Sequence, residues 1–190
     1  MAEKTASERE HKALLIVDMV EDFVAPGAPM EVSLARDIID NIAGEIRYAR
    51  EKKRPVIYVV DRHEPDDPEF DRWPVHSVRD TPGAQIIEAL APQPGDYVVA
   101  KNSYSGFFHT ELDALLDDLD IDDLLICGVT TNVGVLYTAA DAIMRGIGVI
   151  APETCVAARS PEDHAFALRQ INEVLTNPAV RDWQKGDEPK

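Results

Sequence analysis

The stretch LLICGVTTNVGVLYTAADA, residues 124–142, decides the fold. Its first residues, Leu124–Cys127, form a short apolar run that is typical of a buried strand, and Gly128 follows as a turn residue. The pattern after the turn predicts a helix over Asn132–Arg145, which Gly146 ends. A strand that passes through a tight turn into a helix indicates an α/β domain.

Gly134 is the most informative position within this stretch. A nucleophile in the first turn of a helix would face the positive end of the helix dipole and free backbone N–H groups, which favours a thiolate and an oxyanion. Gly134 has no side chain to supply such a group. Glycine also costs about 1 kcal/mol in a helix relative to alanine. Gly134 therefore favours neither this chemistry nor the helix.

Short apolar runs recur along the chain and predict strands. The β-branched residues of Val56–Val60 are a clear example, because such residues fit a pleated, buried surface. The predicted strands are Ala13–Val17, Val56–Val60, Tyr97–Ala100, Leu124–Cys127 and Ile147–Ile150.

Segments with helical spacing lie between these runs. The segment Thr110–Leu119, for example, carries its leucines on one face of a helix. The stretch from Glu64 to Pro82 shows little periodicity and is rich in Pro, Asp and aromatic residues, so we interpret it as a long functional loop. The predicted helices are Glu31–Arg54, Ala84–Leu90, Thr110–Leu119, Asn132–Arg145 and Pro161–Leu175.

The alternation of strands and helices predicts an α/β fold with three αβα layers, in which a mostly parallel central sheet has helices on both faces. We expect one domain over residues 1–190, with loose termini at 1–12 and 176–190. In such sheets, sites form beyond the carboxyl ends of the strands. Asp18, Asp61 with His63, Lys101 and position 134 all follow predicted strands, so we expect them on one rim.

The composition excludes several classes of function. The net charge is −16 with an isoelectric point near 4.6, which disfavours nucleic acids and anionic membrane surfaces as partners. No apolar run approaches the 18 residues of a membrane span, and the polar N-terminus lacks the apolar centre of a secretory signal. Two cysteines make no disulfide framework. We therefore expect a cytoplasmic protein.

Five segments in this order and spacing resemble a known family. They are LIVDMVEDF (15–23), DRH (61–63), WPVH with TPGA (73–76 and 81–84), KNSYSGF (101–107) and residues 128–142. The chain resembles the isochorismatase-like cysteine hydrolases, and most closely the nicotinamidase-like branch, from about Ala13 to about Leu175. Members carry an Asp–Lys–Cys triad. By this resemblance Asp18 and Lys101 are the first two members, and Gly134 stands where Cys is expected.

Taken by themselves, these residues also allow interpretations in which they have no catalytic role. Asp18 alone could cap a helix or sit in an exposed turn, and Lys101 alone could be a surface lysine. Their common rim favours a catalytic pair, in which Asp18 moves a proton and the cation holds Asp18 and stabilises a thiolate. The remaining thiols, Cys127 and Cys155, are interpreted as core packing.

The pattern Asp61-x-His63 places two side chains on the same side of a strand end, and His76 returns from the following loop. One oxygen and two nitrogens suit a divalent metal, although Asp61 could also simply pair with His63. Nicotinamidases bind a metal through the matching residues, and some add a Glu seven positions before the second His, which makes Glu69 a fourth candidate. The resemblance implies Zn²⁺, with Mn²⁺ or Fe²⁺ as alternatives.

The resemblance implies two further features. Phe23, Trp73 and Tyr104 would sandwich a flat ring such as nicotinamide, although they could equally be core residues. Val129 and Thr130 would be joined by a cis peptide bond that aims the N–H groups of Thr130 and residue 134 at an oxyanion.

The sequence thus predicts a metal-containing, homo-oligomeric cysteine amidohydrolase of the nicotinamidase type for a small carboxamide, nearly inactive because Gly134 replaces the nucleophile. We interpret Gly134 as an engineered replacement of Cys rather than as natural decay of the site, because the partners of the nucleophile are retained. A second hypothesis changes the substrate to another carboxamide, a ureido compound, a lactam or an isochorismate-like vinyl ether. A third is a non-catalytic protein that binds a small ligand.

Overall fold

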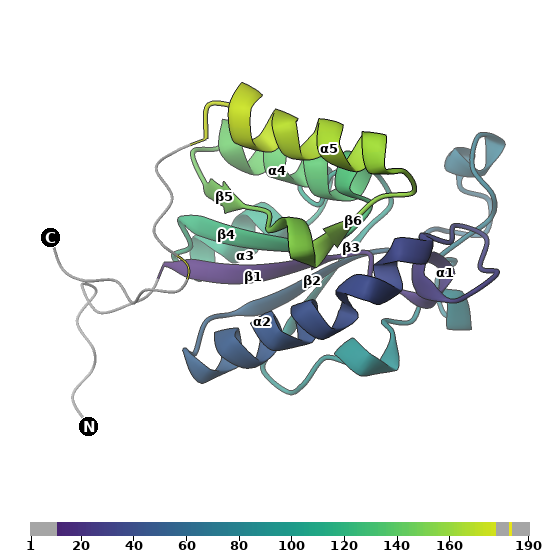
Figure 1. Cartoon of the computed structure of the whole chain (residues 1–190). Coiled ribbons are helices and arrows are strands. Elements are labelled where there is room, and N and C mark those ends of the chain that lie inside the picture. Colours follow the sequence, from purple (N-terminus) through teal and green to yellow (C-terminus); the bar gives the residue numbers. More distant parts are fainter. Residues whose placement is uncertain (1–10, 178–182, 184–190) are drawn as a thin grey trace, which may run out of the picture.

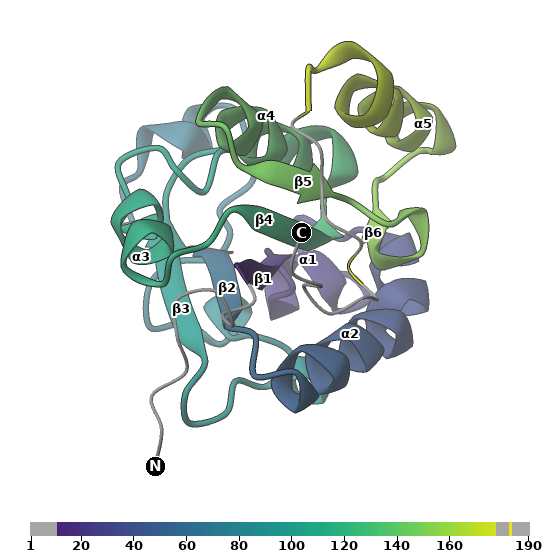
Figure 2. The same ribbon diagram turned by 90° about the vertical axis from the view of Figure 1, so that its left-hand side faces the viewer.

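A parallel sheet lies at the centre of the computed structural model, which describes residues 11–177 and Trp183 (Figure 1). The strands run in the order β3-β2-β1-β4-β5, and β6 pairs in parallel with the carboxyl-terminal end of β4. Figure 2 shows the sheet nearly end-on. Within the described residues the strands are β1 (Lys12–Val17), β2 (Val56–Asp61), β3 (Tyr97–Lys101), β4 (Asp123–Val129), β5 (Gly148–Ile150) and β6 (Val156–Ala157).

The sheet separates two apolar cores, because its central strands are apolar on both faces. Every residue of β1 is buried; Leu14 and Ile16 face one core, and Leu15 and Val17 face the other. Helix α2 (Ile39–Glu51) packs on the first core, whereas α3 (Leu112–Asp118) and α4 (Leu136–Met144) cover the second. Helix α5 (Pro161–Arg169) lies beside α4, and the short α1 (Glu21–Val24) follows β1 (Figures 1 and 2). The predicted fold class is confirmed.

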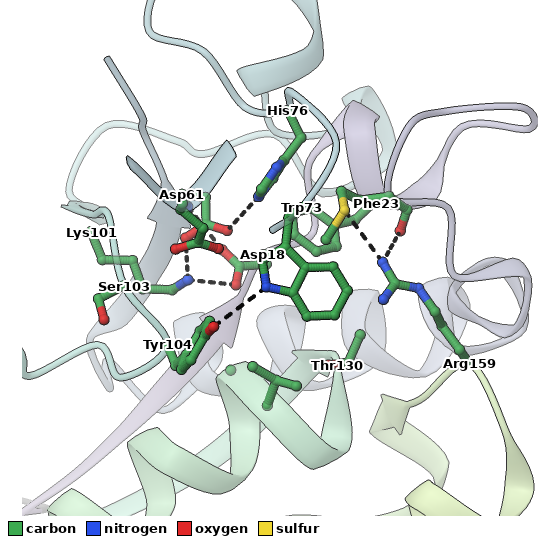
Figure 3. A pocket seen from close by; sticks show the side chains of 14 residues that line it. Asp18, Phe23, Asp61, Trp73, His76, Lys101, Ser103, Tyr104, Thr130 and Arg159 are labelled. Carbon is green, nitrogen blue, oxygen red and sulfur yellow. Dashed lines mark hydrogen bonds and ion pairs between the residues drawn. The ribbon is translucent and has the colours of Figure 1, made fainter. Parts of the chain in front are cut away.

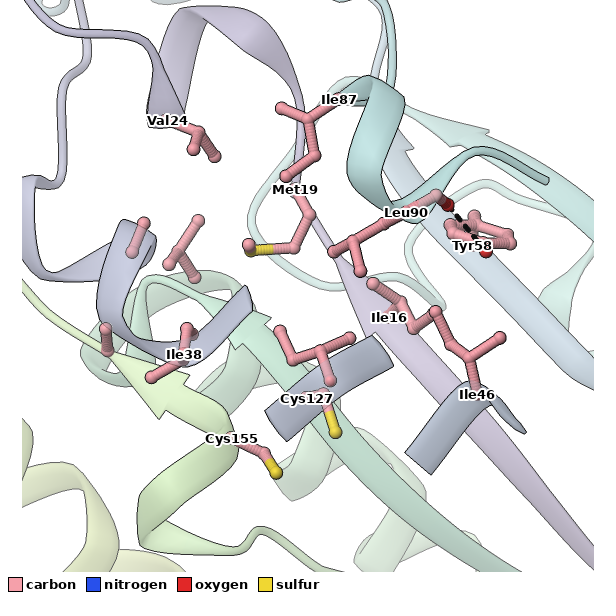
Figure 4. Packing of buried hydrophobic residues seen from close by; sticks show 14 of the residues in the cluster. Ile16, Met19, Val24, Ile38, Ile46, Tyr58, Ile87, Leu90, Cys127 and Cys155 are labelled. Carbon is pink, nitrogen blue, oxygen red and sulfur yellow. Dashed lines mark hydrogen bonds between the residues drawn. The ribbon is translucent and has the colours of Figure 1, made fainter. Parts of the chain in front are cut away.

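The first core also contains both cysteines (Figure 4). Cys127 lies in β4, and Cys155 ends the turn before β6; both side chains are buried among apolar residues such as Ile16 and Ile46. The Tyr58 hydroxyl group in the same core donates a hydrogen bond to the carbonyl oxygen of Leu90 (Figure 4). The interpretation of both thiols as core packing is confirmed.

The five predicted strands are confirmed to within two residues at each end, but the helices differ. The prediction of a helix over Ala84–Leu90 is wrong; two 3₁₀ turns, Pro82–Ala84 and Glu88–Leu90, stand there. Between them the backbone is extended and bonds to the segment after β1: Glu21 N–H donates to Gln85, and Ile87 N–H donates to Met19. The Gln85 carbonyl oxygen and the Ile87 N–H group are used in these bonds, so they are not available for hydrogen bonds within a helix.

The three longest predicted helices are each divided. The segment 31–54 contains a 3₁₀ helix (Ser33–Ile38) and then α2, and 132–145 begins with a π-helical turn, η6 (Thr131–Val135), before α4. The segment 161–175 holds α5 and a second π-helical turn (Gln170–Val174). The predicted helix 110–119 is shorter, and the two-residue strand β6 was missed because it is too short to show periodicity. No helix in the described ranges is long and apolar enough to cross a bilayer.

The expectation of loose termini at 1–12 and 176–190 is wrong for Lys12, Asn177 and Trp183, among other described residues. Lys12 belongs to β1 and is buried. Asn177 exchanges two hydrogen bonds with the backbone of Val149. Trp183 is buried and donates to Glu45 through its indole N–H. Residues 1–10, 178–182 and 184–190 lie outside the described residues.

The close approach of β4 to β1 depends on the absence of a side chain at Gly128. Gly128 has a φ of +111°, and a Cβ there would lie 2.0 Å from the carbonyl oxygen of Val17. We expect Gly128→Ala to lower the free energy of unfolding by about 3 kcal/mol or more, measured by urea denaturation. The control is Gly146→Ala, at a φ of +84° with nothing within 4 Å, which should cost only about 1 kcal/mol. Equal losses would contradict the steric argument.

Candidate active site

The carboxyl ends of four strands bring most of the predicted site residues into one pocket, which His63 and Val129 do not line (Figure 3). Asp18 follows β1 directly, Asp61 ends β2, Lys101 ends β3, and Gly134 lies in η6 after β4. Asp18 adopts a positive φ of 50°, and its N–H donates to Val59 in β2. The pocket is small and partly open to solvent, so it suits a small ligand.

A buried lysine joins two carboxylates at the floor of this pocket. The Lys101 Nζ lies 2.7 Å from Asp18 Oδ2 and also donates to Asp61 Oδ1. The Asp61 N–H donates to Asp18 Oδ1 at 2.8 Å. All three side chains are buried, so each charge depends on the other two. The structure thus brings the predicted Asp18–Lys101 pair together and adds Asp61 to it.

Burial shifts the pKa values of these groups in different directions. Burial raises the pKa of Asp18 to about 7; the charge of Asp61 adds to this effect, and Lys101 opposes it. Burial also acts to raise the pKa of Asp61, but the Lys101 charge and the nearby imidazole rings of His63 and His76 outweigh it and lower this pKa. Burial acts to lower the pKa of Lys101, but the two carboxylates raise it. Asp18 is therefore the member of this set that can both take up and release a proton near neutral pH.

The atoms around Gly134 leave too little space for a side chain at this position. A Cβ at this position would lie 2.9 Å from Val17 Cγ1 and 3.1 Å from both Asp18 Oδ2 and the Val129 carbonyl oxygen. The first distance is shorter than real Cβ contacts, so a side chain here requires Val17 to move. The Asp18 carboxyl group thus comes closer to the backbone of Gly134 than a bulkier residue would allow.

The turn before η6 contains the feature that the resemblance implied. The peptide bond between Val129 and Thr130 is cis. Thr130 and Gly134 both line the pocket, and the Thr130 carbonyl oxygen accepts hydrogen bonds from the N–H groups of Val133 and Val135. The turn is therefore held in place beside Asp18. The role of Thr130 and Gly134 as oxyanion donors stays a prediction.

Asp61, His63 and His76 form a cluster with the geometry of a metal site. Their ligand atoms lie within 4.8 Å of one another, and the Nε2 atoms of His63 and His76 are 3.7 and 3.6 Å from Asp61 Oδ2. Both Nε2 atoms are buried without a hydrogen-bond partner. Since buried polar atoms rarely lack partners, these residues fit a divalent cation.

The other ring nitrogens of the two histidines are held by outer contacts. The Nδ1 atom of His63 lies 3.0 Å from a carboxylate oxygen of Asp67, and the Nδ1 atom of His76 donates to the Pro74 carbonyl oxygen at 2.7 Å. Such contacts leave Nε2 as the free ligand atom and fix its direction. Glu69 lines the pocket but does not belong to the cluster, so its role as a fourth ligand stays a prediction.

The three predicted aromatic residues line the same pocket. Phe23 is buried and meets the His76 ring edge-on, with 5.6 Å between the ring centroids. The Trp73 indole N–H points to the Tyr104 hydroxyl oxygen at 3.4 Å (Figure 3). These side chains provide flat walls for a small planar molecule.

Sequence reasoning missed two residues of this region, Asp67 and Arg159. Asp67 caps the turn that begins at Pro68, and its place four residues after His63 was a usable signal. Arg159 lines the pocket from the connection between β6 and α5. No local pattern pointed to Arg159, because the strand before it is only two residues long.

A model of the isochorismatase domain matches residues 12–181, nearly the whole chain. The chain belongs to the isochorismatase family. This confirms the family and the fold that the sequence motifs indicated, and it makes the protein a member of a family of hydrolases, which act on small-molecule amides among other substrates.

Solved structures of other members of the isochorismatase family resemble the chain over most of its length. Nicotinamidase PncA from Bacillus subtilis is 29% identical with a TM-score of 0.83, and the match covers 90% of this chain and 99% of that one. N-carbamoylsarcosine amidase from Thermoplasma acidophilum is 35% identical with a TM-score of 0.78, over 84% and 91% of the two chains. Pyrazinamidase of Pyrococcus horikoshii, solved in complex with zinc, is 31% identical with a TM-score of 0.81, over 85% and 94%.

We predict one divalent cation per chain. Elemental analysis of protein purified without added metal should show near-unit stoichiometry, and His76→Ala should abolish it. Asp67→Asn should weaken metal affinity by about 10–100-fold in a chelator competition, because it removes the carboxylate charge beside His63 Nδ1. His109→Ala, on an exposed residue outside the cluster, is the control. A stoichiometry near zero that His76→Ala leaves unchanged would remove the metal from this site.

Proposed function

We propose that this protein is a hydrolase in which Asp18 transfers the proton and water supplies the attacking oxygen, with no covalent intermediate on residue 134. The observation that carries this proposal is the packing of Asp18 against Gly134, where Oδ2 lies 3.1 Å from the position of a Cβ. Neither cysteine lines the pocket, so the chain offers no thiol there. Asp18 is the group placed to act as general acid and base.

The neighbours of Asp18 support this role. Lys101 holds the Asp18 carboxyl group in one orientation, and Asp61 holds Lys101. The walls formed by Phe23, Trp73 and Tyr104 would cover the faces of a planar substrate. A substrate that needs only a positioned proton donor and a water molecule therefore suits this pocket.

An isochorismate-like vinyl ether is the substrate class that meets this requirement best. Asp18 would give its proton to the terminal carbon of the double bond, which leaves an oxocarbenium ion at the ether carbon. Water adds to that carbon and returns a proton to Asp18. The resulting hemiketal collapses to a ketone and an alcohol. An unactivated amide, by contrast, depends on attack by a strong nucleophile, which this pocket lacks.

A second candidate function is hydrolysis of an aromatic carboxamide such as nicotinamide. It is favoured by the two unpartnered histidine Nε2 atoms beside Asp61 and by the aromatic walls. A divalent cation held by Asp61, His63 and His76 would supply a positive charge that orients a ring nitrogen. Asp18 would then activate water for attack on the carboxamide, and the reaction would be slow without a thiol.

Asp18→Asn tests the proposed reaction, because asparagine keeps the shape and loses the titrating group. We expect kcat for a vinyl ether such as isochorismate to fall by about 10²–10⁴-fold, measured as keto acid release. Asp117→Asn, on the exposed end of α3, should leave kcat unchanged. Unchanged turnover by Asp18→Asn would overturn the assignment of Asp18.

Two substitutions at Gly134 separate the effect of a thiol from that of added bulk. Gly134→Cys and Gly134→Ala both place a Cβ against Val17 and Asp18, so both should reduce vinyl ether hydrolysis and lower the melting temperature. Only the Cys variant should gain nicotinamide hydrolysis over the original chain, measured as ammonia release. If the glycine form hydrolyses nicotinamide as fast as Gly134→Cys, residue 134 is not the nucleophile position.

A further inference from the structure

Asp22 in α1 and the segment TPGA, residues 81–84, lie outside the pocket but meet each other beside the loop that carries His76. A Cβ on Gly83 would lie 2.1 Å from Asp22 Oδ2 and 2.3 Å from Oδ1. The φ of Gly83 is not in the left-handed region, so space and not backbone conformation requires glycine there. The Asp22 carboxylate is therefore packed directly against the backbone of Gly83.

The Asp22 carboxylate has a hydrogen-bond partner in that loop. Its Oδ2 accepts a hydrogen bond from the backbone N–H of Ser77 at 2.7 Å. Ser77 directly follows His76 and is fully buried. The Ser77 carbonyl oxygen accepts a hydrogen bond from the His63 N–H at 3.0 Å. One residue thus links the Asp22 carboxylate to the backbone of both histidines of the candidate metal site.

The backbone of Ser77 has a bend that needs support. Its φ is +44°, in the left-handed region that residues other than glycine rarely adopt. On one side of the bend, His76 points toward Asp61, and its Nε2 lies 3.6 Å from Oδ2 (Figure 3). On the other side, Val78 forms a parallel bridge with His63. The hydrogen bond of the Ser77 N–H therefore stabilises the bend that directs His76 toward Asp61.

We infer that Asp22 is a positioning residue of the candidate metal site and that Gly83 provides the space for it. Asp22 is not a member of the ligand cluster, so it acts on the cation only through Ser77 and His76. Ligand atoms must be held to within about 0.5 Å of their productive positions, so a small shift at Ser77 lowers metal affinity. The inference rests on the candidate metal site and is independent of the reaction proposed for Asp18.

Competition with a chromogenic chelator for Zn²⁺, using the full chain after removal of metal, tests the inference. Asp22→Ala should weaken zinc affinity by about 10–100-fold, as the loss of an outer contact of a metal ligand does. Asp22→Asn should keep most of the affinity, because its amide oxygen can still accept the hydrogen bond from Ser77. Asp37→Ala, at an exposed acidic residue, removes the same charge and should leave the affinity unchanged.

Gly83→Ala is an independent test, because it displaces the Asp22 carboxylate without removing its charge. The added Cβ needs no unusual backbone conformation, and Asp22 is the side chain that must move. Zinc affinity should fall as it does in Asp22→Ala. In the Asp22→Ala background, Gly83→Ala should cause little further loss, because the two residues act through one contact. Gly44→Ala, in α2 with only an Arg47 atom at 3.8 Å, is the control.

Melting temperatures separate a positioning role from a general effect on folding. Metal-free Asp22→Ala should melt close to the metal-free original chain but lose most of the rise that a fixed concentration of zinc produces. Unchanged zinc affinity in Asp22→Ala, a loss in Asp22→Asn as large as in Asp22→Ala, or additive losses with Gly83→Ala would overturn the inference. A lower melting temperature with an intact zinc-induced rise would also overturn it. Turnover of a vinyl ether tests the proposed function without involving zinc affinity, so the two can fail separately.

Discussion

The buried contact of Lys101 with two carboxylates is the interaction on which the site depends. Lys101 and Asp61 end β3 and β2, and Asp18 directly follows β1, so one ammonium group joins the ends of three neighbouring strands. Removing one partner from such a buried set costs about 3–5 kcal/mol, because the remaining charges lose their compensation. The same contact that fixes the edge of the sheet therefore also fixes the orientation of Asp18.

Asp61 connects this charged set to the histidine cluster. One of its oxygens receives a hydrogen bond from Lys101, and the other lies near the Nε2 atoms of His63 and His76. A cation bound by the histidines would consequently act on the same carboxylate that holds Lys101. The candidate metal site and the proton-transfer group are thus coupled through a single side chain, which is a reason for both to be retained together.

The absence of a side chain at Gly134 has a structural consequence as well as a chemical one. Glycine allows the Asp18 carboxyl group and Val17 to approach the π-helical turn closely. The resulting pocket has an acid–base group, a lysine and aromatic walls but no thiol. Relatives that resemble this chain act on different small amides, so the family alone does not select a substrate. The choice of substrate therefore depends on the groups that line the pocket.

The sequence by itself determined the features that depend on local patterns. Apolar runs identified five strands, because a strand buried on both faces must be apolar throughout. The position of Asp18, Asp61 and Lys101 after those strands placed them on one rim, and the spacing of the histidines indicated the metal cluster.

Only the tertiary structure decided features that depend on contacts between distant segments. Residues 84–90 are not helical because their backbone groups bond near residues 19–21, and Arg159 enters the pocket through a connection that has no periodicity. The close approach of Asp18 to Gly134 is likewise a packing relation between residues far apart in the chain, which no local pattern encodes.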